Sequence, residues 1–138
     1  PRYEDLVPTV HLALRPERAA LNARIDARAR AIFDAGLIEE VRALVDEGLA
    51  EGTTAPRAIG YAQALAVLDG TMSREEAVEA TAAATRKLAS RQIKWFRRDP
   101  RVRWIDVELT EDGRCTDAER SRVTRQAREL VLAVDGVA

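Results

Sequence analysis

The sequence predicts a mostly α-helical fold with two short β-strands, and three observations support this prediction. Apolar residues recur at helical spacing over most of the 138 residues. Glycines, prolines and capping residues mark where the helical segments begin and end. Only two short runs have the β-branched and aromatic content that is typical of strands. Because 46% of the residues are apolar, the chain can bury a core, and we expect one compact unit.

The elements expected in chain order are a strand at residues 7–14, helices at 16–35, 37–47, 56–68 and 73–98, a strand at 102–107 and a helix at 117–134. The first strand is expected to end where Pro16 takes the first position of a helix, a position that proline favours. Gly36 and Gly48 end the first two helices, because glycine readily adopts the left-handed conformation found at helix C-termini.

Pro56 marks the start of the third helix. Ser73 with Glu76 forms a capping box that opens the fourth helix, and Thr116 with Glu119 does the same for the last. The two strands are too isolated to form a stable sheet alone. We therefore expect further strands from a portion of the protein that precedes this chain.

Composition excludes several kinds of site and location. The single cysteine, Cys115, and the single histidine, His11, supply neither an internal disulfide nor a Cys/His zinc site, and we expect no metal ligands in this chain. No apolar run is long enough to span a membrane, and the first residues lack the pattern of a signal peptide. A cytoplasmic monomer without membrane contact is expected. The start at Pro1, without a methionine, indicates a piece of a longer protein.

Positive charge is concentrated in one segment. Eight basic residues face a single aspartate, Asp99, between residues 86 and 103, so this segment carries a net charge of +7 although the whole chain carries −1. On a helical projection of residues 85–98, basic side chains lie on one side. The other side, with Leu88, Trp95 and Phe96, is expected to be buried. This pattern indicates a surface for a nucleic acid. A plain solvated helix, a membrane-surface helix and a helix that docks on an acidic partner are the alternatives.

Three polar residues are expected on apolar helix faces. Arg28 falls in a stripe between Ile25 and Ile32, and an unpaired charge there is costly, so either an internal salt bridge or an anion such as phosphate should satisfy it. Thr85 and Gln92 fall two turns apart on the inner side of their helix. Both should be hydrogen-bonded, either to nearby backbone groups or in a polar channel.

Gly60 is expected in the opening turns of the third helix, where glycine costs about 1 kcal/mol relative to alanine. Close approach of another backbone or of a ligand would compensate. Helix N-termini attract phosphates, and Arg57 and Tyr61 lie beside this position. Ordinary helix packing is the alternative.

Three segments together carry a family resemblance. They are RAIGY at 57–61, TRKLASRQIKWFR at 85–97 and WID at 104–106. These segments closely resemble the C-terminal signature of bacterial tRNA dimethylallyltransferases. The resemblance extends upstream and covers residues 8–107. The final helix resembles the family only in being a helix at this place in the chain.

This resemblance implies a P-loop-type α/β enzyme with a helical insertion and a channel through the protein. Such an enzyme transfers a dimethylallyl group from dimethylallyl diphosphate, assisted by Mg²⁺, to the exocyclic N6 amine of the adenine 3′ of the anticodon in tRNA. The adenine must leave its stack to reach the donor. Residues 1–138 would form a single C-terminal portion. The phosphate loop and the aspartate general base would lie in the missing N-terminal portion, since no G-x-x-x-x-G-K-[ST] motif is present. We expect no catalytic residue here, Mg²⁺ ligands mainly outside this chain, and no activity of the chain alone.

The resemblance also implies residue roles. Arg28 stands at the position of the family's diphosphate-contacting arginine. The residues implied to contact the tRNA anticodon stem-loop are Arg57, Ala58, Ile59, Gly60, Tyr61, Ala62, Arg86, Ser90, Arg91, Gln92, Lys94, Trp95 and Arg97. Ser90 replaces a frequent basic residue and Lys94 a frequent threonine, so the basic charge is redistributed along the helix. A non-catalytic helical nucleic-acid-binding module and a structural helical domain that docks on an acidic partner are the competing hypotheses.

Overall fold

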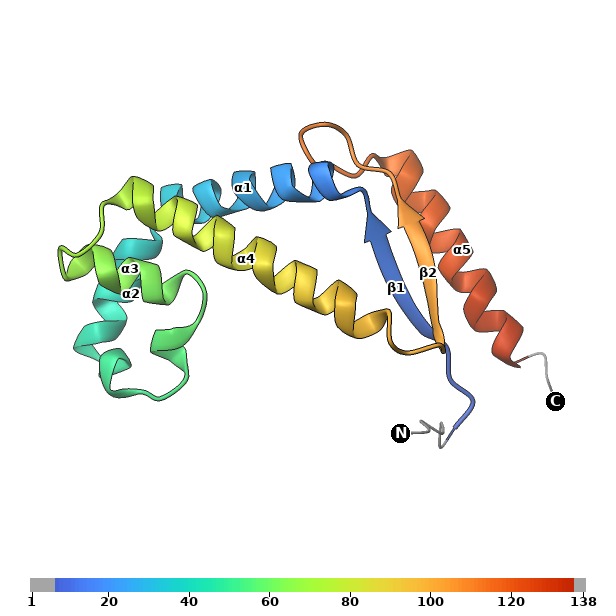
Figure 1. The fold of residues 1–138 in the computed structure, drawn as a ribbon, viewed down its shortest axis with the longest axis horizontal. Coiled ribbons are helices and arrows are strands. Elements are labelled where there is room, and N and C mark those ends of the chain that lie inside the picture. The colour runs from blue at the N-terminus through green and yellow to red at the C-terminus, as the bar shows by residue number, and fades with distance from the viewer. Residues whose placement is uncertain (1–6, 136–138) are drawn as a thin grey trace. The chain divides into compact units, whose positions relative to one another are not determined.

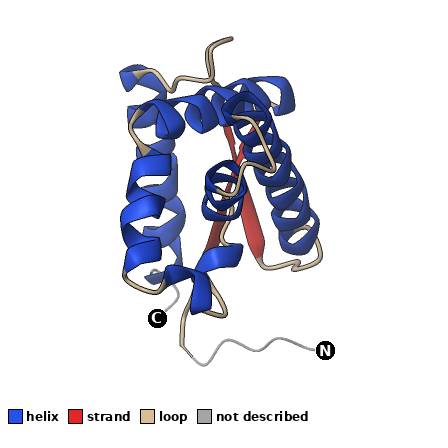
Figure 2. Cartoon of the chain, turned by 90° about the vertical axis from the view of Figure 1, so that its left-hand side faces the viewer, coloured by secondary structure: helices blue, strands red, loops and turns tan. Residues whose placement is uncertain are grey.

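Among the described residues, helices account for most of the fold and two strands complete it, as the sequence predicts (Figure 2). The computed structural model describes residues 7–135. The elements in order are β1 (His11–Pro16), α1 (Arg18–Asp34), α2 (Leu37–Asp46), the 3-10 helices η1 (Leu49–Glu51) and η2 (Ala55–Arg57), α3 (Tyr61–Leu68), α4 (Arg74–Phe96), β2 (Val102–Val107) and α5 (Asp117–Asp135) (Figure 1).

The chain forms two compact units, in contrast to the single unit expected from the sequence. One unit contains the residues up to Leu21 and those from Gln92 onward, and the other contains Asn22–Arg91. Both boundaries fall inside helices, within α1 and within α4. No linker composition therefore marks them in the sequence.

The first unit contains a two-stranded parallel sheet. β1 and β2 pair over their full lengths, with Leu14 opposite Ile105. Ile105 is fully buried, and α5 packs against β2 (Figure 1). Leu14 remains 58% exposed.

The boundary between β1 and α1 differs from the prediction. β1 spans His11–Pro16 instead of 7–14, because its six residues pair in register with the six of β2. Pro16 therefore ends the strand and does not open the helix. Glu17 precedes α1 and accepts a hydrogen bond of 2.9 Å from the amide of Ala20, which satisfies a free N–H group of the first helical turn.

The second unit is a helical assembly with a core of mainly small and aliphatic side chains. Its buried residues are Ile25, Ala29, Phe33, Ile38, Val41, Gly60, Ala64, Ala77, Val78, Thr81 and Ala82. α2 packs against α3. Two ion pairs join α1 to α4, one between Asp34 and Arg74 and one between Asp26 and Arg86.

A single helix over residues 56–68 is not formed, and Gly60 is the reason. Its φ of 99° and ψ of −54° interrupt the helix, so η2 ends at Arg57 and α3 begins only at Tyr61. The Gly60 amide donates a hydrogen bond of 2.8 Å to the side chain of Gln63. A methyl group at Gly60 would lie 3.5 Å from the Leu37 side chain. Gly60 thus adopts a positive-φ conformation that favours glycine, and its backbone lies close to α2. It precedes α3 and does not lie within a helix.

Candidate nucleic-acid interface

Exposed basic side chains gather in the C-terminal half of α4 and just beyond it. They are Lys87, Arg91, Lys94, Arg97 and Arg98. Within residues 7–135, none of these side chains forms an ion pair. Charges of one sign that lack local partners create a positive potential, which attracts polyanions. We call these five residues the basic face.

Arg86 and Arg101 belong to the same positively charged segment but are held by carboxylates. Arg86 pairs with Asp26, and with Glu79 at 2.7 Å. Arg101 binds Asp99 at 2.7 Å, and this hydrogen bonding lowers the pKa of Asp99 to about 2. The segment of +7 therefore contains two arginines whose charge is compensated locally.

The apolar side of this part of α4 is open to solvent in the described residues. The sequence predicted a buried face here, but Trp95 is 65% exposed, and Leu88 and Phe96 are also exposed. The rings of Trp95 and Phe96 meet edge to face with centroids 4.9 Å apart. The buried residues of α4 are small and lie in its N-terminal half, from Ala77 to Ala82.

Arg28 lies on α1, where the structure corrects the predicted burial. The buried stripe of α1 consists of Ile25, Ala29 and Phe33, spaced four residues apart, and Arg28 is exposed beside it. The alternative of an internal salt bridge is not seen either, because Arg28 makes no ion pair in the described part of the chain. Its guanidinium group is available to an anion.

The segment from Arg57 to Ala62 divides into an exposed and a packed part. Arg57, Ala58 and Ile59 are exposed in the connection between η2 and α3. Gly60 is buried, and the hydroxyl of Tyr61 donates a hydrogen bond to Glu40 of α2, which raises the pKa of Tyr61. Ala62 is half-buried in α3.

The polar residues expected on the inner side of α4 have different surroundings. The Thr85 hydroxyl donates a hydrogen bond of 2.8 Å to the backbone carbonyl of Thr81, so the backbone satisfies it. Gln92 is exposed, and Ser90 is half-buried. These contacts favour local hydrogen bonding for Thr85 over the polar channel.

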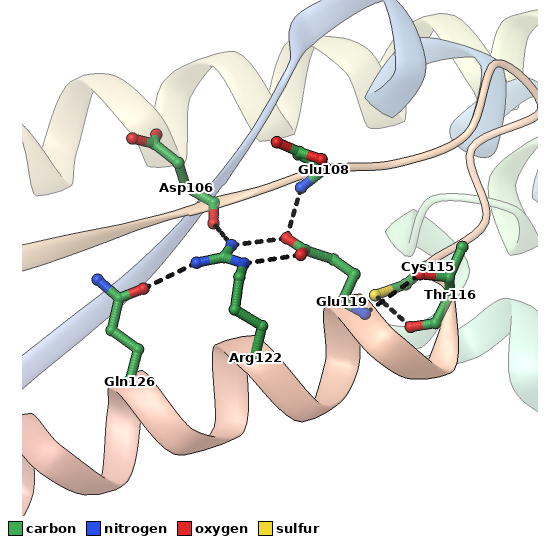
Figure 3. Close-up of polar contacts among 7 residues, drawn as sticks. All are labelled: Asp106, Glu108, Cys115, Thr116, Glu119, Arg122 and Gln126. Carbon is green, nitrogen blue, oxygen red and sulfur yellow. Dashed lines mark hydrogen bonds and ion pairs between the residues drawn. The ribbon is translucent and has the colours of Figure 1, made fainter.

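Sequence reasoning missed a polar network around the buried Glu119 in the first unit (Figure 3). Glu119 accepts a hydrogen bond of 2.8 Å from the Glu108 amide and binds Arg122 at 2.6 Å. The hydrogen bond from Arg122 has the largest effect, and together with the bond from the Glu108 amide it lowers the pKa of Glu119 to about 2. Arg122 also donates to the Asp106 carbonyl at 2.6 Å and to Gln126 at 3.0 Å. The network fixes α5 on the carboxyl end of β2.

One part of this network had a sequence signal. Thr116 and Glu119 have capping-box spacing, and the Glu119 amide does donate to the Thr116 hydroxyl at 3.2 Å. The Glu119 carboxylate reaches Glu108 instead of the Thr116 amide. Only the fold brings Glu108 to that position.

A sequence model of the IPP transferase family matches residues 2–99. The chain belongs to the IPP transferase family. A tRNA dimethylallyltransferase of Pseudarthrobacter chlorophenolicus is 52% identical over 106 residues, which are 77% of this chain and 36% of that relative. One of Kineococcus radiotolerans is 52% identical over 105 residues, 76% of this chain and 33% of the relative. The chain thus spans about a third of the length of these curated relatives.

Two solved structures of tRNA isopentenylpyrophosphate transferases resemble this IPP transferase chain. The one from Bacillus halodurans has a TM-score of 0.80 at 26% identity, and the match covers 95% of this chain and 41% of that one. The one from Staphylococcus epidermidis has a TM-score of 0.69 at 29% identity over 87% of this chain and 38% of that one. The structural match to the Bacillus halodurans protein covers more of this chain than the family model, which matches residues 2–99.

The described residues contain neither a membrane-spanning helix nor a group of metal ligands. No helix between residues 7 and 135 is long and apolar enough to cross a membrane. In the same part of the chain, no three histidine, cysteine, aspartate or glutamate side chains are grouped so that they could hold a metal ion.

Proposed function

We propose that the protein containing this chain transfers a dimethylallyl group from dimethylallyl diphosphate to the N6 amine of the adenine 3′ of the anticodon in tRNA. Family membership and the names of the relatives support the reaction class. The structural observation that carries the proposal is the unpaired basic face on α4. An enzyme that acts on an anticodon loop must hold a polyanion, and basic side chains do this through the phosphates.

This chain supplies groups that bind and orient the two substrates. Arg91, Lys94 and Arg97 contact phosphates of the anticodon stem-loop, and the exposed Arg57 to Ile59 segment adds a second contact. The exposed Trp95 ring offers a stacking surface, which suits unpaired bases in RNA loops. Arg28 binds the diphosphate of the donor through its exposed guanidinium group.

The remaining machinery lies outside residues 1–138 in this proposal. A P-loop-type core would extend the sheet of β1 and β2, since parallel strands normally lie in larger sheets covered on both faces. The 58% exposure of Leu14 is consistent with such a cover. Mg²⁺ would assist the diphosphate through ligands in the rest of the protein. No step assigned to this chain depends on the ion.

The test is prenyl transfer by the full-length protein. Purified protein, dimethylallyl diphosphate and tRNA are incubated, and nucleosides from the digested tRNA are analysed by mass spectrometry. We expect N6-dimethylallyladenosine at the position 3′ of the anticodon with the full-length protein and none with residues 1–138 alone. Tight tRNA binding without any transfer would favour a non-catalytic nucleic-acid-binding module.

A further inference from the structure

We infer that Arg86 is a positioning residue that fixes α1 against α4 and does not contact RNA phosphate. This inference rests on the proposed function and changes the role of one residue of the predicted tRNA-contacting set. Arg86 donates one hydrogen bond to Asp26 of α1 and another, of 2.7 Å, to Glu79 of its own helix. All three residues lie in the Asn22–Arg91 unit.

The charges around Arg86 argue against a phosphate contact. One guanidinium group between two carboxylates leaves a local net charge of −1, which repels a phosphate. The Arg86 side chain is only 28% exposed, and its planar group already uses two of its N–H directions. The neighbouring Lys87 is exposed and has no ion pair in the described residues. The RNA-contacting part of the helix therefore begins at Lys87.

The position of Asp26 suggests what the bridge orients. Asp26 precedes Arg28 by two residues on α1, and the second bridge, from Arg74, reaches Asp34 further along the same helix. The two bridges thus hold α1 to α4 on both sides of Arg28. Because Arg28 is the proposed diphosphate contact, loss of the Arg86 bridge should impair use of the prenyl donor and spare RNA affinity.

The experiment compares Arg86→Gln, Asp26→Asn and their double variant with Lys87→Gln in the full-length protein. Binding of an anticodon stem-loop RNA is titrated at several salt concentrations, and the KM for dimethylallyl diphosphate is measured. We expect Arg86→Gln and Asp26→Asn each to raise this KM, by roughly tenfold, without a change in the salt slope. Lys87→Gln should flatten the slope of log K against log[salt] by about 0.7 to 0.9.

Two further readouts separate positioning from a phosphate contact. The double variant should be no worse than Arg86→Gln, because Arg86→Gln already breaks the bridge to Asp26. Arg86→Lys should bring the donor KM part of the way back to the wild-type value. A flatter salt slope in Arg86→Gln would overturn the inference.

Failure of the proposed function can be distinguished from failure of the Arg86 inference. If the wild-type protein transfers no prenyl group, the function is wrong. The bridge is then judged by thermal unfolding of the wild type, the two single variants and the double variant. The positioning role requires that the losses in Tm of the two single variants are not additive in the double variant. Fully additive losses would contradict it.

Discussion

Arg15 and Asp106 face each other at the carboxyl ends of β1 and β2, and the Arg15 guanidinium binds the Asp106 carboxylate through hydrogen bonds of 2.6 and 3.0 Å. The same guanidinium lies 5.9 Å from the centre of the Trp104 ring. The hydrogen bond from Arg15 and its positive charge lower the pKa of Asp106. The pair therefore lies one position before the end of the strand pairing, near the edge where open parallel sheets bind ligands.

The first prediction concerns this pair. Asp106→Asn should lower the Tm only slightly, because exposed ion pairs contribute little to stability. Since folding lowers the pKa of Asp106, the stabilisation is complete above the ordinary carboxyl pKa and disappears as the pH falls through the folded-state pKa. The Tm difference between wild type and variant should therefore shrink in acid. A difference that stays constant with pH would show that the charge of Asp106 is not the cause.

The second prediction concerns Glu119. Its pKa is lowered from 4.5 to about 2, so its ionised form stabilises the fold above about pH 4.5, and this contribution is lost as the pH falls toward about 2. Glu119→Gln should remove that part of the pH dependence and lower the denaturant midpoint at neutral pH. Glu129→Gln, an exposed change on the same helix, is the matched control and should keep the wild-type profile.

The third prediction concerns Gly60. Gly60→Ala should destabilise the protein by about 1 to 3 kcal/mol, because a residue with a side chain is strained at φ 99° and ψ −54°. Gly70→Ala is the comparison, since Gly70 has φ 71° and no atom within 4 Å of an added methyl group. Denaturant unfolding should show the larger loss for Gly60. Equal losses would mean that the unusual conformation of Gly60 has no special cost.

Local signals predicted much of this fold. β2 occupies the predicted residues 102–107, and the capping box of Ser73 and Glu76 opens α4, with hydrogen bonds of 2.8 and 3.2 Å. Both features depend on neighbours within a few residues. The interruption at Gly60 was missed because its conformation is adapted to packing beside Leu37 of α2.

The site was predicted less completely, for a related reason. A concentration of basic charge is visible in the sequence, but its partners are not. Asp26 lies 60 residues from Arg86, and only the folded chain brings them together. The predicted burial of Arg28 failed because helical spacing alone does not decide which edge of an apolar stripe faces solvent.

The fourth prediction concerns Arg28 in the full-length protein. Arg28→Ala should lower kcat/KM for dimethylallyl diphosphate by roughly ten- to a hundredfold, because a hydrogen bond to a charged group is worth about 1.5 to 3 kcal/mol. Arg30→Ala removes an equally exposed arginine from the same helix and should have little effect. The measurement is steady-state kinetics with a folded Arg28→Ala protein, which tests the proposed contact of Arg28 with the diphosphate. Unchanged kinetics would exclude a diphosphate contact.

The salt dependence of RNA binding tests the central claim, that the basic face of α4 holds tRNA. Wild type and an Arg91→Glu, Lys94→Glu variant of the full-length protein are titrated with anticodon stem-loop RNA at several salt concentrations. The control is Arg125→Glu, Arg128→Glu, which makes the same charge change on exposed positions of α5. We expect the α4 variant to bind more weakly and its slope of log K against log[salt] to flatten by about 0.7 to 0.9 for each lost contact, while the α5 variant keeps the wild-type slope. Identical slopes for all three folded proteins would mean that the basic face is only a solvated surface.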